Sequence, residues 1–165
     1  MKALVVYDSV FGNTEKIAQA IGQAIAQAIG AALGPQGQVE TLPVGQVTAE
    51  RLQGLDFLVV GSPTRSLRPT EGISQWLKVL PKHCLSGVRI AAFDTRLWLE
   101  TIDSKALRFI VDKGGYAAST IARALEKKGG KLVIPPEGFL VTGEQGPLKD
   151  GELERAGAWA KQIVS

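Results

Sequence analysis

Continuous hydrophobic runs alternate with amphipathic stretches along this chain. Residues 3–7 are all apolar apart from one tyrosine and end at a turn, which is typical of a strand covered on both faces. Over residues 14–33 the apolar side chains instead recur every three or four positions, and Gly30 and Gly34 close the pattern. This spacing predicts one long helix. A buried strand followed at once by a helix is therefore the first unit of the fold.

The same alternation continues to the end of the chain. Further strands are predicted at residues 38–42, 56–61, 88–93 and 131–134, the last resuming at 139–141 after Pro135 and Pro136. Helices are predicted at residues 48–52, 73–80, 117–125 and from about residue 150 onward. We expect Trp76 in the core, Leu153 facing inward, and Trp159 half exposed beside the apolar stripe. Residues 103–112 fit a short helix capped by Ser104 or a structured loop equally well.

Strands that alternate with helices predict a parallel sheet with helices on both faces. Five such units give an α/β fold, a three-layer doubly wound sandwich around a five-stranded sheet. No internal repeat, low-complexity tract or linker interrupts the 165 residues. We therefore expect residues 1–165 to form a single domain.

Composition narrows the classes of function. The net charge of +3 is mild and dispersed, which favours anionic small ligands or partners over nucleic acid. No apolar run is long enough for a membrane span, and the N-terminus lacks the features of a signal peptide. The lone Cys84 cannot form an internal disulfide, so a cytoplasmic protein is expected. His83 and Cys84 lack the companions that a metal or nucleophilic site needs, so we expect both to be structural.

In an open parallel sheet, ligands bind beyond the carboxyl ends of the strands. The segments expected there are DSVFGNT, SPTRSLRPT and DTRLWLETID, which follow the first, third and fourth strands. A strand order of 2-1-3-4-5 would bring all three together. Each is richer in hydroxyl groups, glycine or arginine than a simple connection requires.

The first of these segments suits a phosphate group. Backbone N–H groups at a helix start form an anion site without a cationic side chain, and Gly12 lets the backbone approach the anion closely. Ser9 and Thr14 add hydroxyl groups, and Asn13 adds an amide. The chain has no GxxxxGK followed by Ser or Thr, and no GxGxxG after the first strand. The alternative is that Ser9, Asn13 and Thr14 only cap the helix.

Taken together, the three segments resemble the flavin-binding loops of the flavodoxins. DSVFGNT is similar to the loop that holds the FMN phosphate, whose pattern is Ser/Thr-x-Ser/Thr-Gly-x-Thr, with Phe11 in place of one hydroxyl residue. GSPTR resembles the second flavin loop, particularly the PTR form of the flavodoxin-like quinone reductases. DTR falls where the third flavin loop begins. The resemblance covers essentially the whole chain.

The resemblance implies FMN as the cofactor, with no metal and no catalytic side chain. It assigns the phosphate to Ser9, Val10, Phe11, Gly12, Asn13 and Thr14. It assigns the isoalloxazine edge to Pro63, Thr64 and Arg65, and the pyrimidine side and ribityl chain to Asp94, Thr95 and Arg96. Trp98 would stack on the flavin, or would instead cover apolar residues of its own loop.

Charge separates the possible functions. Electron-carrying flavodoxins are acidic around the flavin, whereas this chain places Arg65, Arg68 and Arg96 in the expected flavin loops. If they face the flavin, these cations would stabilise its anionic reduced form; otherwise they are solvated loop charges. The expected function is electron transfer with a redox partner protein. The alternatives are an NAD(P)H-dependent quinone oxidoreductase and a flavin-free module for another phosphorylated ligand, which Phe11 favours.

Overall fold

The computed structural model describes residues 1–98, 105 and 116–165. Its strands are β1 (Lys2–Tyr7), β2 (Gln38–Pro43), β3 (Phe57–Pro63), β4 (Arg89–Leu97), β5 (Lys131–Leu132) and β6 (Glu137–Val141). Its α-helices are α1 (Asn13–Leu33), α2 (Glu71–Val79), α4 (Ala117–Lys127) and α5 (Glu152–Val164). Short 3-10 helices lie at Gly34–Gln36, Val44–Gln46 and Ala49–Leu52. The two alternatives for residues 103–112 fall outside the described residues, apart from Lys105.

The strands form one parallel sheet in the order β2-β1-β3-β4-β5, which confirms the predicted order. The predicted interruption near the C-terminus is also confirmed. β5 pairs with the start of β4, and β6 pairs with its end, so both lie on the same side of β4. Pro135 and Pro136 separate them, because proline has no N–H to donate to the ladder.

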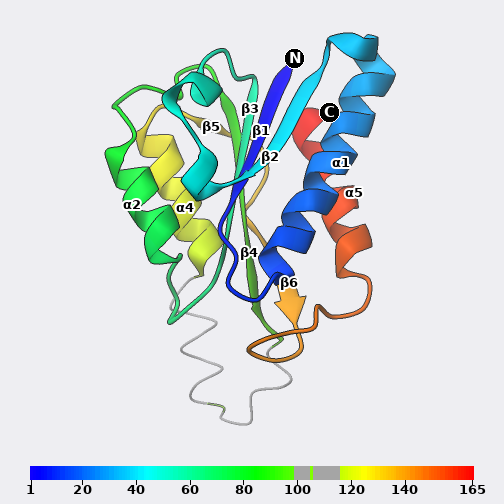
Figure 1. Ribbon diagram of the computed structural model, residues 1–165, viewed down its shortest axis with the longest axis vertical. Helices are drawn as coiled ribbons and strands as arrows, with labels where there is room; N and C mark the ends of the chain where they lie inside the picture. Colours follow the sequence, from blue (N-terminus) through cyan, green and yellow to red (C-terminus); the bar gives the residue numbers. More distant parts are fainter. Residues whose placement is uncertain (99–104, 106–115) are drawn as a thin grey trace.

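Two helical layers cover the sheet, as Figure 1 shows: α1 and α5 lie on one face, and α2 and α4 lie on the other. Alternate residues of β1 enter the two cores. Val5 and Tyr7 pack with the α1 and α5 side chains, whereas Leu4 and Val6 pack with those of α2 and α4. The continuous apolar run of β1 is thus explained by burial on both faces. Trp76 is partly buried against the second core.

Helix α5 buries Ala156, Ala160 and Ile163 as predicted, but two of its residues differ from the prediction. Trp159 is buried, with 7% of its surface exposed, and its ring packs edge-on against Phe93 and Phe139 at centroid distances of 6.3 and 6.0 Å. Leu153 is exposed instead of facing inward. The reason is that Glu152 takes the inward position, where its carboxylate accepts a hydrogen bond from the Leu140 amide at 2.6 Å. Both predictions, for Trp159 and for Leu153, were therefore wrong.

Strand β4 is longer than its sequence indicated. It was expected to end at Phe93, with DTR opening a loop, but it continues to Leu97. Ser62 and Pro63 of β3 pair with Asp94 and Thr95 on one side, and β6 supplies partners on the other. Because both neighbouring strands extend this far, the polar residues complete the ladder rather than leave it.

Candidate ligand-binding site

A cavity of about 310 Å³ lies at the carboxyl end of the sheet, within the size range of small-molecule sites. Four segments line it. Its residues are Val10, Phe11, Asn13 and Thr14; Pro63, Thr64, Arg65 and Ser66; Thr95, Arg96 and Leu97; and Val141 and Glu144. The structure thus brings together residues from all three predicted segments. A larger open groove between α1 and α5 is lined by side chains of those two helices and reaches the first loop only at Gly12.

The first loop ends in a backbone turn that suits glycine. Gly12 has a φ of +91°, in the left-handed region, and immediately precedes α1. The Ser9 hydroxyl oxygen accepts hydrogen bonds from the amides of Gly12 (3.1 Å) and Glu15 (3.3 Å). Ser9 therefore caps the helix. Within the described part of the chain, the amides of Asn13 and Thr14 donate no hydrogen bond, so the positive end of α1 keeps two free donors.

The side chains of Asn13 and Thr14 tie this loop to other segments. The Asn13 side-chain amide donates to the Gln145 carbonyl at 3.1 Å, and the Thr14 hydroxyl lies 2.8 Å from that of Thr95. Both residues are buried. Their side chains are thus engaged by the protein itself, while their backbone amides remain available. Any anion here would be held chiefly by the main chain.

The second loop is held by hydrogen bonds at Thr64 and then turns sharply at Ser66 and Leu67. The Thr64 amide donates to the Thr95 carbonyl at 2.9 Å, and the Thr64 hydroxyl accepts from the Ala117 amide at 3.1 Å. Arg65 and Arg68 then exchange two backbone hydrogen bonds around Ser66 and Leu67. Those two residues have φ values of 48° and 63°. Such a turn costs about 1 kcal/mol or more per residue without glycine, and strain of this kind is concentrated at functional sites.

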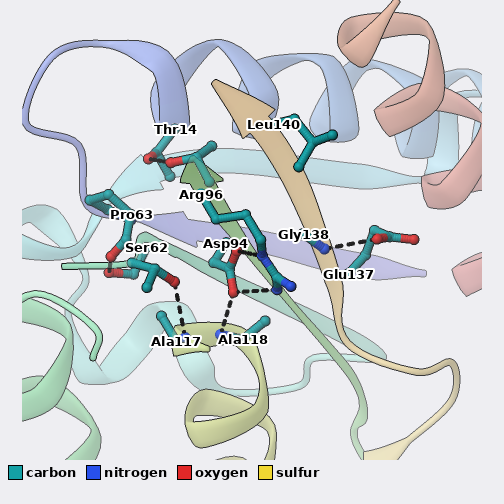
Figure 2. A network of polar contacts seen from close by, with 12 residues as sticks. Thr14, Ser62, Pro63, Asp94, Arg96, Ala117, Ala118, Glu137, Gly138 and Leu140 are labelled. Atoms are coloured by element: carbon teal, nitrogen blue, oxygen red, sulfur yellow. Dashed lines mark hydrogen bonds and ion pairs between the residues drawn. The ribbon is translucent and has the colours of Figure 1, made fainter. Parts of the chain in front are cut away.

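Buried Asp94 and partly buried Arg96 form an ion pair, drawn in Figure 2. The Arg96 Nε and Nη2 atoms each donate to the Asp94 carboxylate at 2.7 Å, and the Ala118 amide in the first turn of α4 donates at 3.0 Å. Burial raises the pKa of the Asp94 carboxyl, against the bonds from Arg96 and Ala118, which favour the charged form. The Asp94 carboxylate therefore faces Arg96 and α4, and Asp94 is not among the residues that line the cavity, so its place beside a ligand stays a prediction.

The Arg96 guanidinium is closely surrounded, by the Tyr116 ring and by β6 at Gly138. Its central carbon is 3.4 Å from the centroid of the Tyr116 ring. A Cβ atom at Gly138 would stand only 2.1 Å from Arg96 Nε, so a larger residue on this part of β6 would displace the guanidinium from its present place. Arg96 lines the cavity while its charge is matched by Asp94. It cannot supply the unpaired positive charge that was expected of it.

Arg65 is the arginine that keeps a free charge beside the cavity. It forms no ion pair with any described residue, and its guanidinium carbon lies 5.8 Å from the centroid of the Phe11 ring. Arg68 is exposed and does not line the cavity. Glu144 lies on the wall together with Arg65. The positive charge at the cavity is thus smaller than three arginines would give.

An apolar rim and a fourth segment complete the site. Val10, Phe11 and Leu97 line the cavity with 49%, 44% and 40% of their surfaces exposed. Trp98 is not among the lining residues; the Lys149 amine lies 4.3 Å from its ring centroid. The turn after β6, with Glu144 and Gln145, was missed from the sequence. Its signal was the glycine-rich GEQGP turn that follows the last strand at this edge.

Two further findings concern metal binding and membrane-spanning helices. No group of three or more His, Cys, Asp or Glu side chains among the described residues is arranged to hold a metal ion. Among the helices that the structure describes, none combines the length and apolar character needed to cross a membrane.

Comparison with known proteins gives a match in structure only. No protein-family model matches the sequence, and no curated protein does so. Oxidised flavodoxin 1 of Bacillus cereus superposes with a TM-score of 0.72 at 17% identity, covering 99% of this chain and 97% of that one. A flavodoxin from the domain Archaea gives 0.72 at 23%, covering 99% and 96%.

A larger protein contains the same architecture. Rubredoxin oxygen:oxidoreductase of Desulfovibrio gigas matches with a TM-score of 0.70 at 17% identity, over 99% of this chain but 35% of that one. Identities this low show shared architecture. The sheet order, the two helical layers and these superpositions agree, and this chain therefore has the flavodoxin-like fold.

Proposed function

We propose that this chain binds FMN in the cavity at the carboxyl end of the sheet and transfers electrons to and from a redox partner. The observation that carries the proposal is the pair of free amides, of Asn13 and Thr14, at the start of α1. A helix start with free N–H groups is an anion site in its own right. The start of α1 borders the cavity that the other two loops also line.

The residues present fit the two ends of such a ligand. Asn13 and Thr14, which carry the free amides, both line the cavity, so a phosphate there would lie beside the start of α1. Val10, Phe11 and Leu97 offer apolar contacts for a flat ring. When bound, the flavin would supply the redox chemistry, because no described side chain does so.

The protein's own groups would hold and orient the ligand. Thr64 is fixed through Thr95 and Ala117, so the edge of the second loop is preorganised. Arg65 places a positive charge at the cavity, which would favour negative charge on a reduced ligand. Glu144 would oppose that effect from the same wall. We further propose that residues 1–165 act as one domain in the cytoplasm.

A second candidate function is an NAD(P)H-dependent quinone oxidoreductase. The unpaired Arg65 at the cavity favours it, because a cation there can attract an anionic dinucleotide. A third is a flavin-free module for another phosphorylated ligand. It is favoured by Phe11 and by the engagement of the Asn13 and Thr14 side chains within the protein.

The test is a comparison of FMN with riboflavin, which lacks the phosphate. Purified protein freed of ligand is titrated with each, and quenching of flavin fluorescence is followed. We expect one FMN per chain, and riboflavin binding weaker by about 100-fold or more because two amides and the helix dipole lose their anion. Equal affinities would contradict the phosphate site. If neither ligand binds, the flavin proposal fails, and the third function gains support.

Anaerobic reduction separates the first two functions. FMN-loaded protein is mixed with NADPH alone, and the visible absorbance is followed. A carrier should stay oxidised until a reductase is added. Rapid bleaching by NADPH, with turnover of benzoquinone, would instead favour the oxidoreductase.

A further inference from the structure

Positive charge is not dispersed along the chain, as was expected, but is concentrated in two segments that the cavity does not use. Between Glu71 and Asp94 the sequence contains no acidic residue, whereas Lys78, Lys82 and Arg89 are basic. Residues 116–136 contain a single acid, Glu126. Their basic residues are Arg123, Lys127, Lys128 and Lys131. Because the whole chain carries only +3, the residues outside these two segments have a net negative charge.

The fold places the two segments side by side. Helices α2 and α4 share one face of the sheet (Figure 1), and Arg89 of β4 pairs with Lys131 of β5. Lys78, Lys127 and Lys128 line the same groove between the helices, which has a volume of about 310 Å³. We call this surface the α2–α4 basic face and define it by Lys78, Val79, Lys82, Arg123, Lys127 and Lys131.

The cations of this face are exposed to solvent, although Arg123 Nε also donates to the Ser119 carbonyl at 3.3 Å. Lys78, Lys82, Arg123, Lys127 and Lys131 are all exposed, and none forms an ion pair with a described residue. Two other basic residues nearby are held by the protein instead. Lys128 donates to the Leu80 carbonyl, and Arg89 lies over the Phe57 ring at 3.9 Å. Lysines in a last helical turn do complement the helix dipole, but that does not account for Lys82 and Lys131, which lie outside the helices.

An apolar side chain projects from among these cations. Val79, between Lys78 and Lys82, has 74% of its surface exposed, the largest value for a large hydrophobic residue among those described. It stands alone and does not belong to a broad apolar patch of the kind that forms the core of a protein interface. Isolated apolar side chains surrounded by lysines suit a lipid interface, where the charges meet anionic headgroups and the apolar group enters the boundary.

We propose that the α2–α4 basic face docks on an anionic phospholipid surface. Lys78, Val79 and Lys82 lie at the C-terminal end of α2, near the amino ends of the strands and away from the cavity at their carboxyl ends. Docking would thus hold the protein at the membrane while the cavity stays open to a partner. The proposal does not depend on which ligand the cavity binds.

The test is sedimentation of the purified full chain with phospholipid vesicles. One set contains phosphatidylcholine alone, and the other contains about 30 mol% phosphatidylserine. We expect at least about tenfold stronger binding to the anionic set, lost at about 0.5 M NaCl because salt screens the attraction. Equal binding to both sets, or to neither, would overturn the proposal. So would full competition by millimolar inorganic phosphate, which would indicate a site for a free anion.

Charge-reversal variants locate the surface. Lys78→Glu combined with Lys127→Glu should weaken binding to the anionic vesicles by about 25-fold or more, since each lysine near such a surface contributes about fivefold. Val79→Ser should weaken it by a few-fold. The matched control is Lys16→Glu combined with Lys161→Glu, two exposed lysines that line the groove between α1 and α5. That control should bind as the parent does.

Two outcomes of the variant series test whether the α2–α4 basic face is the surface that binds the vesicles. If the control pair weakens binding as much as the Lys78 and Lys127 pair, only net charge matters and the assigned face is wrong. Near-native circular dichroism and unchanged FMN titration in each variant would show that the fold and the cavity survive. Loss of vesicle binding with FMN binding intact would support the docking face independently of the proposed function.

Discussion

The first loop and the end of β4 approach the same cavity, yet they use their polar groups in opposite ways. At the first loop, the amides of Asn13 and Thr14 have no partner within the described chain. At the end of β4, Asp94 and Arg96 satisfy each other and the first turn of α4. One region is left open for a ligand, whereas the other is closed by its own contacts.

The difference arises from what lies beside each segment. Helix α1 starts directly after the left-handed Gly12, so its first amides have no preceding turn to bond with. Strand β4 instead continues between two neighbours, and Gly138 of β6 leaves room for the Arg96 side chain. Charged residues at a strand end therefore need not face a ligand. Their neighbours decide whether they are available.

Removing the Asp94 carboxylate should have the largest effect on the stability of the protein. We expect Asp94→Ala to lower the free energy of unfolding by about 3 kcal/mol, because the partly buried Arg96 guanidinium and the buried Ala118 amide would both lose their acceptor. Urea denaturation measures this loss. The control is Asp56→Ala, whose exposed carboxylate accepts a hydrogen bond from the Lys2 amide, with an expected cost below about 1 kcal/mol. Similar losses in the two variants would mean that the ion pair contributes little.

A charge at Gly12 should disable the open region without unfolding the protein. Gly12→Asp should weaken FMN binding by about 100-fold or more, because a carboxylate would repel the phosphate at the helix start. Gly12→Asn carries the same backbone strain without the charge and should lose about tenfold or less. Fluorescence titration compares them.

Gly151 offers a matched control for the same substitution. It precedes α5 as Gly12 precedes α1, with a φ of 86° against 91°, but the residues beside it do not line the cavity, whereas Phe11 and Asn13 beside Gly12 do. Gly151→Asp should cost about as much stability as Gly12→Asp and leave FMN affinity unchanged. An equal loss of affinity in both variants would show that strain, not the site, is responsible.

Filling the space beside Arg96 should disturb the closed region alone. Gly138→Ala would force the guanidinium to move, because the new Cβ would overlap it, and we expect a loss of about 1–3 kcal/mol in stability. Gly30→Ala is the control, since Gly30 lies within α1 with open space around it. That variant should gain about 0.5–1 kcal/mol. Thermal or urea unfolding distinguishes the two signs, and a neutral Gly138→Ala would argue against such close surroundings of the guanidinium.

The smallest effect is expected where the two regions meet. Thr14→Val and Thr95→Val each leave a buried hydroxyl without its partner, at a cost of about 1–3 kcal/mol. In the double variant both hydroxyls are gone, so we expect its loss to fall about 1 kcal/mol short of the sum. A double-mutant cycle in urea measures this coupling. Strict additivity would mean that the hydroxyl pair does not link the regions.

The periodicity of apolar residues was sufficient to predict the alternating strands and the described helices, whereas the sheet order was implied by the resemblance to the flavodoxins. The apolar runs of buried strands and the apolar stripes of helices are patterns of local sequence, and they match the elements of the structure. Helix α5 shows where this fails: Glu152 is polar yet points inward, because its partners are the Leu140 amide and Arg155. A hydrophobic pattern alone could not place Leu153 outward and Trp159 inward.

The candidate site was predicted in part. The first two loops could be located because a helix start and a proline turn carry local signals. The burial of Asp94 could not be predicted, since it depends on Gly138 and Ala118, which come from segments far along the chain. The same holds for Glu144, which joins the cavity only through the position of β6. The identity of the ligand stays a proposal.

The divided strand beyond β4 has a consequence for the behaviour of the protein in crowded solution. An uninterrupted edge strand presents a row of unpaired donors and acceptors on which another chain can grow. Here that border consists of two short pieces, with Pro135 and Pro136 between them. Proline offers no N–H to an incoming strand. We therefore expect this border of the sheet to resist edge-to-edge aggregation, even when the cavity holds no ligand.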